Sequence, residues 1–238
     1  MGIRISRSKP RSLLLSYLYR AQKLLPLSSA ARFRLFLNLE WIFDRLAHEY
    51  SFGAYSADNH PVRRHSRTFL LKFLNENDSV LDLGCNTGDI SRAVAQKAKR
   101  VVGIDYNAEA IERANNADNP PNLRFVSSEA LDYLQKNTEP FDVLLLSHIL
   151  EHLDDPKSFI RRFKDYFRNL YIEVPDFDRS YLNQYRQDQQ LPLIYTDLDH
   201  VSEFDRDELN ALLEDCGIEV IAAEYRYGVQ KLWCSVKK

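Results

Sequence analysis

The hydrophobic positions of this chain follow two alternating rhythms from about residue 79 onward. Short runs of β-branched residues and leucine, each as long as one strand, alternate with longer windows of helical spacing. The strand candidates lie at 79–83, 100–104, 122–126, 141–146 and 169–174, and the helical windows at about 88–98, 107–116, 128–136 and 156–168. This order predicts an α/β fold, in which a parallel sheet carries helices on both faces. A helix at 206–216 followed by strands at 218–226 and 230–236 predicts an antiparallel C-terminal hairpin.

Before residue 62 the pattern has helical spacing only. A short amphipathic pattern at 11–25 precedes a longer one at about 30–49, which is too apolar to stand alone in water and must pack on something. The segment 51–61 is rich in Ser, Gly, Asn and His and predicts a hinge before a helix at about 62–75. The sequence therefore predicts a helical N-terminal extension, residues 1–61, and a second domain, residues 62–238.

One long stretch without a regular pattern, about 175–204, follows the fifth strand. It contains Tyr181, Tyr185 and Tyr195 together with several Asp and Gln residues. Because aromatic faces stack on sugar rings while amides and carboxylates bind hydroxyls, the stretch fits a lid over a polyhydroxylated ligand. An ordinary solvated loop has the same composition, and both interpretations stay open.

Charge is distributed unevenly along a chain of otherwise ordinary composition. Of the 238 residues, 45% are hydrophobic and 28% charged, which is typical of a globular protein, and the apolar runs are too short to span a bilayer. Eight basic residues precede the first acidic residue, Glu40, which leaves 24 basic and 34 acidic residues, a net charge of −10, for the rest. The basic leader, residues 1–34, therefore either touches an anionic membrane surface or packs on the core or on a second copy in a homo-oligomer.

A glycine-rich turn follows the first strand of the alternating region. Asp82 lies in that strand, and Gly84 and Gly88 flank a turn that opens a helix, where glycine permits positive φ and close approach of a ligand to the backbone. The GxGxxG spacing of dinucleotide sites is missing, which disfavours a dinucleotide. The second strand ends in Asp105, 23 positions after Asp82, where a carboxylate can accept both hydroxyls of a ribose.

The stretch Val80-Leu81-Asp82-Leu83-Gly84-Cys85-Asn86-Thr87-Gly88 resembles the first motif of the class I methyltransferases that use S-adenosylmethionine (SAM). Asn86 stands where that family usually has a glycine, and asparagine tolerates the left-handed conformation. The resemblance implies a Rossmann-like methyltransferase sheet and SAM as cofactor, with Asp105 on the ribose and Tyr106 near the adenine or ribose. The segment Phe125 to Ala130 resembles the family's adenine-binding element. The cofactor-binding residues implied are Asp82, Gly84, Cys85, Asn86, Gly88, Asp105, Tyr106, Glu129, Ala130 and Ser147.

The fourth strand is followed by His148, Glu151 and His152, spaced so that they share one face if the segment is helical. Ligands bind beyond the carboxyl ends of strands in open α/β sheets, so these side chains should border the transferred methyl group. His148 or His152 could act as a general base that removes a hydroxyl proton. Alternatively the side chains hold a divalent metal that lowers the pKa of that hydroxyl, or they only cap a helix or fill the core.

A family resemblance supports the interpretation as a metal site. The stretch from His148 to His152 resembles the metal-binding E-x-x-E-H of ubiquinone-pathway O-methyltransferases and small-RNA 2′-O-methyltransferases, with His148 in place of the first Glu. Asp199-His200-Val201-Ser202-Glu203-Phe204 loosely matches D-H-x-F-E-W of the RNA enzymes and supplies His200 as a fourth candidate ligand. Three imidazoles and a carboxylate would suit Zn, Fe, Mn or Co better than Mg.

The methyl acceptor is predicted from weaker resemblances. The segment from Glu203 to Ile218 is similar to the ending of small-molecule and glycan methyltransferases, and residues 39–47 to leaders of enzymes of surface-polysaccharide assembly. These favour O-methylation of a sugar, a glycan or a related small molecule in polysaccharide biosynthesis. RNA 2′-O-methylation at a metal-assisted site and a non-catalytic SAM-fold binding module are the alternatives; the acidic body argues against nucleic acid as a partner.

The number and spacing of the cysteines indicate in which cellular compartment the protein is expected. Cys85, Cys216 and Cys234 are odd in number and lack CxxC spacing, which argues against a disulfide framework. A reducing cytoplasm is the expected location, with attachment to the membrane periphery through the leader as the alternative.

Overall fold

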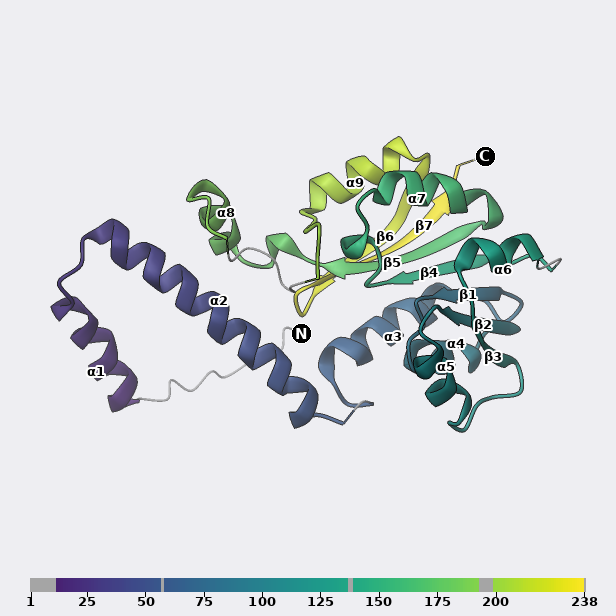
Figure 1. Cartoon of the computed structure of the whole chain (residues 1–238), viewed down its shortest axis with the longest axis horizontal. Helices are drawn as coiled ribbons and strands as arrows, with labels where there is room; N and C mark the ends of the chain where they lie inside the picture. The colour runs from purple at the N-terminus through teal and green to yellow at the C-terminus, as the bar shows by residue number, and fades with distance from the viewer. Residues whose placement is uncertain (1–11, 57, 137–138, 193–198, 238) are drawn as a thin grey trace, which may run out of the picture.

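The computed structural model describes residues 12–56, 58–136, 139–192 and 199–237. Figure 1 shows an α/β body from which a long helical arm projects. Arg4, Arg7, Lys9 and Arg11 of the basic leader, and Tyr195 of the predicted lid, lie outside the described residues.

The predicted sheet is confirmed, and its seven strands have the order β3-β2-β1-β4-β5-β7-β6. Strands β1 to β5 are parallel, while β7 pairs antiparallel with both β5 and β6. The strands are β1 Ser79–Leu83, β2 Arg100–Asp105, β3 Leu123–Ser127, β4 Val143–Ser147, β5 Asn169–Pro175, β6 Ile218–Arg226 and β7 Val229–Val236. The result is the α/β sheet that the sequence pattern predicted, with its antiparallel hairpin at the C-terminal edge.

Helices cover both faces of the sheet and create two separate cores. Successive residues of a strand point to opposite faces, so Leu144 and Leu146 enter one core and Val143 and Leu145 the other. Helices α6, α7 and α9 cover the first core, and α3, α4 and α5 the second. Their bounds are α3 Pro61–Phe73, α4 Asp89–Ala95, α5 Ala108–Asn115, α6 Ala130–Lys136, α7 Pro156–Phe163 and α9 Arg206–Asp215, with a short 3₁₀ helix η3 at Lys164–Tyr166.

The strand order reverses between β1 and β4, and this places the loops that matter for ligands. Leu83 at the end of β1 is in register with Ile104 of β2 and with Leu146 of β4. The segments that leave β1, β2 and β4 therefore emerge side by side. In open α/β sheets the crevice at such a reversal, beyond the carboxyl ends of the strands, is where ligands bind.

The N-terminal arm consists of α1 Leu13–Ala21, a 3₁₀ turn η1 Gln22–Leu24 and the long helix α2 Ser29–Ala54. The side chains of Ser12 and Ser28 accept hydrogen bonds from the first turns of α1 and α2. The predicted hinge at 51–61 is wrong in its first part, because α2 continues to Ala54; the Phe52 ring stacks on His60 at 4.3 Å and gives this last turn a packing partner. None of the described helices is long and apolar enough to cross a membrane.

The predicted irregular stretch at 175–204 is also partly wrong. It contains a 3₁₀ turn, η4 Phe177–Arg179, and the helix α8 Tyr181–Asp188. Ser180 caps α8 by accepting from Leu182 N, and Asn183 and Arg186 are buried on its inner side. Arg186 donates to Leu37 O and pairs with Glu40, both on α2. Contacts with α2, which local sequence patterns do not reveal, account for this helix.

Candidate functional site

The loop after β1 has the backbone that its glycines predicted. Gly84, Asn86 and Gly88 have φ of 70°, 48° and 83°, all in the left-handed region. The Gly84 and Cys85 N–H groups donate to Ile104 O at 2.8 and 3.0 Å, which ties the loop to β2. A side chain on Gly88 would overlap the Phe125 ring. The backbone of this loop therefore lies at the crevice, held against β2 by these two hydrogen bonds.

Asp82, in β1 just before this loop, is bonded to the helix that follows the loop. Its carboxylate is 3% exposed and accepts a hydrogen bond of 2.5 Å from Ser91 Oγ of α4. Burial raises the pKa of Asp82 to about 6, against the opposing effect of the Ser91 hydroxyl. The thiol of the neighbouring Cys85 is buried, which raises its pKa well above the ordinary value. Neither group is presented to solvent.

Asp105 lies at the end of β2 and joins two loops. One carboxylate oxygen accepts from Asn86 N at 2.9 Å and the other from Asn107 N at 2.8 Å. Next to it Tyr106 is 81% exposed. Glu129 is exposed and Ala130 half-buried at the start of α6, and Ser147 is half-buried at the end of β4. The sequence-predicted cofactor residues thus meet at one edge of the sheet.

The acceptor-side residues do not share the single helical face that their spacing suggested. His148 has φ of 56°, and this left-handed turn breaks the chain before the 3₁₀ turn η2 Leu150–His152. His148 Nδ1 lies 2.9 Å from Glu151 Oε1, and His148 Nε2 lies 3.5 Å from Glu173 Oε1. His148 therefore faces two carboxylates, while His152 points elsewhere.

These two carboxylates decide the charge of His148. Partial desolvation of the ring lowers the pKa of His148, but the hydrogen bonds and negative charges of Glu151 and Glu173 more than offset this and raise it to about 10. At neutral pH the ring is therefore an imidazolium. An imidazolium holds no lone pair for a proton, so this arrangement does not favour His148 as the base.

Glu173, in β5, was missed by the sequence analysis. It is buried and accepts hydrogen bonds from Ser66 Oγ of α3, at 2.8 Å, and from the Tyr171 hydroxyl. Burial alone would raise the pKa of Glu173, but His148 and the two hydroxyls together lower it. The available signal was one acidic residue inside the otherwise apolar strand run from Tyr171 to Val174.

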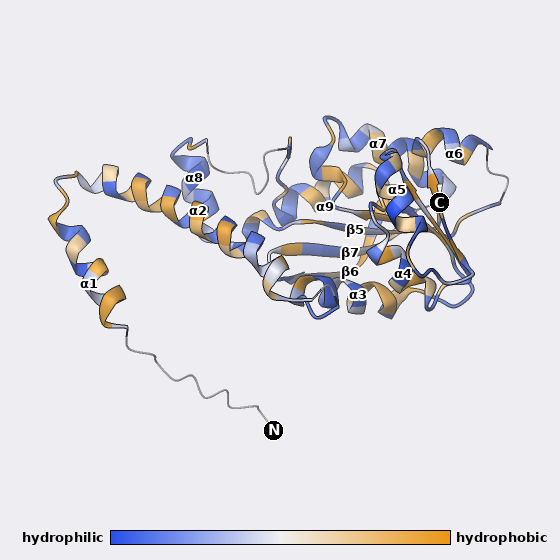
Figure 2. Ribbon diagram, turned by 60° about the horizontal axis from the view of Figure 1, so that its bottom comes forward, coloured by the Kyte–Doolittle hydropathy of each residue, from blue (hydrophilic) through white to orange (hydrophobic). Residues whose placement is uncertain are grey.

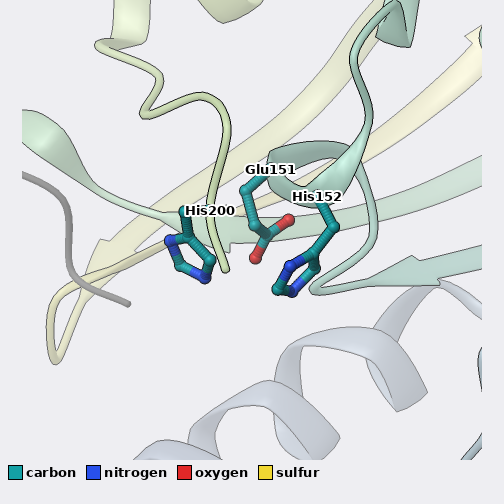
Figure 3. Close-up of side chains that lie close together, drawn as sticks. All are labelled: Glu151, His152 and His200. Carbon is teal, nitrogen blue, oxygen red and sulfur yellow. The ribbon is translucent and has the colours of Figure 1, made fainter. Parts of the chain in front are cut away.

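A second group forms around Glu151, His152 and His200 (Figure 3), whose potential ligand atoms all lie within 4.8 Å of one another. The Glu151 side chain is completely buried, and its Oε2 has no hydrogen-bond partner among the described residues. Two backbone N–H groups, of Val201 and Ser202, donate to Glu151 O at 2.9 and 3.1 Å and bring the His200 segment to it. His148, the fourth residue of the predicted ligand set, is outside this group.

Both histidines of the group are oriented by oxygen atoms. His200 Nδ1 lies 2.9 Å from Glu203 Oε1, and His152 Nδ1 lies 3.3 Å from Asp199 O. With Nδ1 engaged in this way, Nε2 is the ring nitrogen suited to a metal, and such outer partners are typical of metal-binding histidines. Two imidazoles and a carboxylate form a donor set that fits a transition metal.

A hollow of about 330 Å³ lies between α2, the carboxyl end of β5 and the first residue of β7. His148 and His200 line it together with Trp41, Asp44 and Arg179. A larger hollow of about 630 Å³ shares Trp41, Asp44 and Arg179 with it and extends along α2 toward α8. The sequence analysis had assigned α2 to a separate extension, and it did not name Trp41, Asp44 or Arg179 as site residues.

Only some residues of the predicted lid line a hollow. Asn183 and Arg186 of α8 line the larger hollow. Tyr185 instead packs edge-on against Phe33 of α2, with ring centroids 5.5 Å apart, and Tyr181 packs on Tyr185. These two tyrosines therefore attach α8 to the arm.

The chain is similar to known methyltransferases. Residues 55–223 match the family model of a methyltransferase domain. A ubiquinone biosynthesis O-methyltransferase of Aliivibrio fischeri is 34% identical over 84 residues, which is 34% of this chain and 36% of that protein. An uncharacterized RNA methyltransferase of Mycoplasma mobile is 33% identical over 87 residues, 35% of this chain and 24% of that protein. The chain thus spans about a third of the length of the curated relatives it matches.

Solved structures share the fold at low sequence identity. A SAM-dependent methyltransferase from Aquifex aeolicus superposes with a TM-score of 0.55 at 19% identity, covering 72% of this chain and 89% of that one. Magnesium protoporphyrin IX methyltransferase from Synechocystis, solved with bound S-adenosylhomocysteine, superposes with a TM-score of 0.55 at 15% identity, covering 82% and 94%.

Proposed function

The chain belongs to the class I SAM-dependent methyltransferases, and we propose that it transfers the methyl group to a hydroxyl oxygen of a sugar, a glycan or a related small molecule. In this reaction the hydroxyl oxygen attacks the methyl carbon as the bond from that carbon to the sulfonium sulfur breaks. S-adenosylhomocysteine leaves, and the hydroxyl proton must be removed. The protein has to hold both substrates in line and lower the cost of losing that proton.

We assign the cofactor to the edge formed by the loops after β1, β2 and β3. The left-handed loop from Gly84 to Gly88 would lie beside the amino-acid part of SAM, because glycine lets the backbone approach a ligand closely. Asp105 would accept the ribose hydroxyls in place of part of its present bonding to Asn86 N and Asn107 N. Tyr106, Glu129 and Ala130 would border the adenine, and Ser147 the transferred methyl group.

The observation that carries the acceptor proposal is the hollow between α2 and the sheet. It opens beside His148, directly after β4, where the methyl group would be presented. Trp41 offers an aromatic face, and Asp44 and Arg179 offer charged groups that can bind hydroxyls. Its wall of mixed aromatic and charged groups suits a polyhydroxylated molecule better than an apolar one. We accordingly treat α2 as part of the catalytic unit, although the division at residue 61 placed it apart.

For removal of the proton we favour the metal over a histidine base. Glu151, His152 and His200 would hold a divalent transition metal, and the buried, unpartnered Glu151 Oε2 supports this. Such a metal lowers the pKa of a hydroxyl that binds to it. His148 would act as the partner that orients the Glu151 carboxylate, since its Nδ1 lies 2.9 Å from Glu151 Oε1 while its Nε2 faces Glu173, and both ring nitrogens are thereby occupied.

RNA 2′-O-methylation uses the same bond changes and remains the rival assignment. Its support is the match of Asp199 to Phe204 with the RNA enzymes and the RNA methyltransferase among the relatives. The chain from Glu40 onward has a net charge of −10, which repels a polyphosphate. A ribose hydroxyl would fit the hollow, but the body offers no excess of positive charge for the rest of an RNA.

The test is transfer of labelled methyl groups from SAM to separate pools of nucleotide sugars, glycans and RNA, with and without EDTA. We expect label in a sugar or glycan pool and its loss in EDTA. Glu151→Gln should lower metal content and turnover while SAM still binds, whereas Asp154→Asn, an exposed acid three residues away, should change neither. Label in RNA alone would reverse the choice of acceptor, and full activity in EDTA would eliminate the metal.

A further inference from the structure

The surface of residues 13–25, which we call the leader surface, is apolar and largely exposed. No residue of α1 is buried, and Figure 2 shows hydrophobic positions recurring along this helix, which projects away from the body. Its exposed apolar side chains are Leu13, Leu14, Leu15, Tyr17, Leu18, Tyr19, Leu24 and Leu25, with exposed fractions from 38% to 86%. Soluble proteins rarely expose a contiguous apolar area of this kind unless it contacts a partner or a membrane.

The apolar residues cover most of the circumference of α1. Ser16 and Arg20 are four positions apart and therefore lie on the same side of the helix. They form a narrow polar strip, since every other position of α1 is leucine, tyrosine or alanine. A helix that is apolar around most of its circumference is normally buried in protein or lipid. At a lipid interface the apolar side chains enter the boundary between headgroups and acyl chains.

The leader surface also has a positive charge without acidic neighbours in sequence. No acidic residue precedes Glu40, while eight basic residues do. No ion pair joins Arg20 or Lys23 to another described residue. Arg32 instead donates to Lys23 O and Leu25 O, at 3.2 and 2.7 Å, and so fixes the bend between η1 and α2. The exposed leucines and the cations are thereby held on one projecting arm.

We propose that the leader surface docks on an anionic lipid bilayer. Leucine side chains would enter the acyl boundary, tyrosines with an apolar ring and a polar tip suit the headgroup level, and Arg20 and Lys23 would meet anionic headgroups. A second copy of the chain would cover the apolar side chains, since α2 also exposes Phe36 and Phe43, but it would not supply an anionic surface for Arg20 and Lys23. The proposal goes beyond the methyl transfer and does not depend on it, since the leader precedes the family match at residue 55.

The experiment is flotation of the full chain with vesicles of phosphatidylcholine alone or with one part in four of phosphatidylglycerol. We expect binding to the anionic vesicles that weakens as salt is added. The pair Arg20→Gln and Lys23→Gln should weaken binding about 30-fold, from about fivefold for each charge. Leu14→Ser with Leu18→Ser should abolish binding, whereas Ile221→Ser, an equally exposed apolar residue on β6, should leave it unchanged.

Binding of SAM by each variant shows that the body is folded, whatever the acceptor proves to be. Three results would overturn the proposal. The first is absence of binding to anionic vesicles, and the second is binding that the Leu14→Ser, Leu18→Ser protein retains. The third is a wild-type protein that does not bind vesicles but sediments as a dimer, where the double variant is a monomer; this would assign the leader surface to a second copy.

Discussion

The two halves of the sheet's carboxyl edge present different chemical groups. At β1 and β2 the edge is mainly backbone, where three left-handed residues form a loop and N–H groups bond to Ile104 O and to the Asp105 carboxylate. At β4 and β5 the edge is mainly charged side chains, where His148 lies between Glu151 and Glu173 and two further histidines face Glu151. The first half combines the loop at 84–88 with the neighbouring end of β2, and the second combines residues from three separate parts of the chain, 148–152, Glu173 and His200.

This difference corresponds to two functions, binding of the cofactor and activation of the methyl acceptor. SAM presents the same groups in every methyltransferase, and a backbone loop of fixed shape can bind it with few specific side chains. An acceptor hydroxyl must be oriented and relieved of a proton, which calls for charged groups held in a region of low dielectric. Substitutions on the β1–β2 side should therefore change cofactor affinity, and those on the β4–β5 side should change stability, charge state and turnover.

The largest effect is expected at Glu173. Glu173→Ala should lower the free energy of unfolding by about 3–5 kcal/mol, because it removes the partner of His148 and leaves the buried Ser66 and Tyr171 hydroxyls without an acceptor. Urea unfolding measures this directly. Glu219→Ala, an exposed glutamate on β6, is the control and should stay within about 0.5 kcal/mol of wild type. A loss below about 1 kcal/mol at Glu173 would mean that the buried charges are not coupled as described.

On the cofactor side, Gly88→Ala should cost about 2–4 kcal/mol of stability and abolish tight SAM binding. The residue has φ of 83°, and a Cβ there would overlap the Phe125 ring. Thermal unfolding and calorimetry with SAM report the two effects. Gly53→Ala, in α2 with open space around it, should be neutral or stabilising. Equal behaviour of the two variants would refute the requirement for a left-handed backbone in the loop.

Asp105→Ala should weaken SAM and S-adenosylhomocysteine together. Losing one bidentate carboxylate costs about 1.5–3 kcal/mol, or roughly tenfold to over a hundredfold in the dissociation constant. Calorimetry on both ligands gives the value, with Asp118→Ala as the matched exposed acid. If affinity is unchanged, the ribose is not held at the end of β2.

The smallest effect concerns the pH dependence of stability. The pKa of His148 is raised from 6.5 to about 10 in the folded protein, so its stabilising contribution is complete below pH 6.5 and is lost as the pH rises toward 10. The effect is modest because 42% of the side chain is exposed. The difference in melting temperature between wild type and His148→Gln should therefore shrink between pH 6.5 and pH 10. A difference that is constant across this range would contradict a charged His148.

The sequence predicted the fold and the β1–β2 side of the site better than the β4–β5 side. The sheet, its hairpin and the glycine loop were predictable because each depends on local spacing, and Asn86 could be assigned a left-handed conformation from its residue type. The pairing of His148 with Glu173 was not, because 25 residues and a strand crossover separate the two. The left-handed φ of His148, which separates it from His152, is uncommon even for histidine and could not be predicted from the residue type.

Helix α8 and the role of helix α2 at the acceptor side were not predicted, because both depend on contacts between distant parts of the sequence. Helix α8 depends on Arg186 reaching Leu37 O and Glu40 on α2, contacts nearly 150 residues apart in sequence. The role of α2 in lining the hollow is likewise a tertiary property, since its apolar pattern only indicated that it packs on something. Long-range packing therefore limits what sequence patterns predict, even where the residue types are suggestive.

The most direct test of the central claim, that α2 and the β4–β5 edge together bind the acceptor beside SAM, is turnover of Trp41→Ala with the acceptor found by the labelling assay. Trp41 lines both hollows and belongs to none of the segments assigned to the cofactor. The account predicts that kcat/KM for the acceptor falls at least about tenfold, as for loss of an aromatic contact worth at least 1.4 kcal/mol, while the dissociation constant of SAM is unchanged. Unaltered kcat/KM, or a parallel loss of SAM affinity, would contradict it.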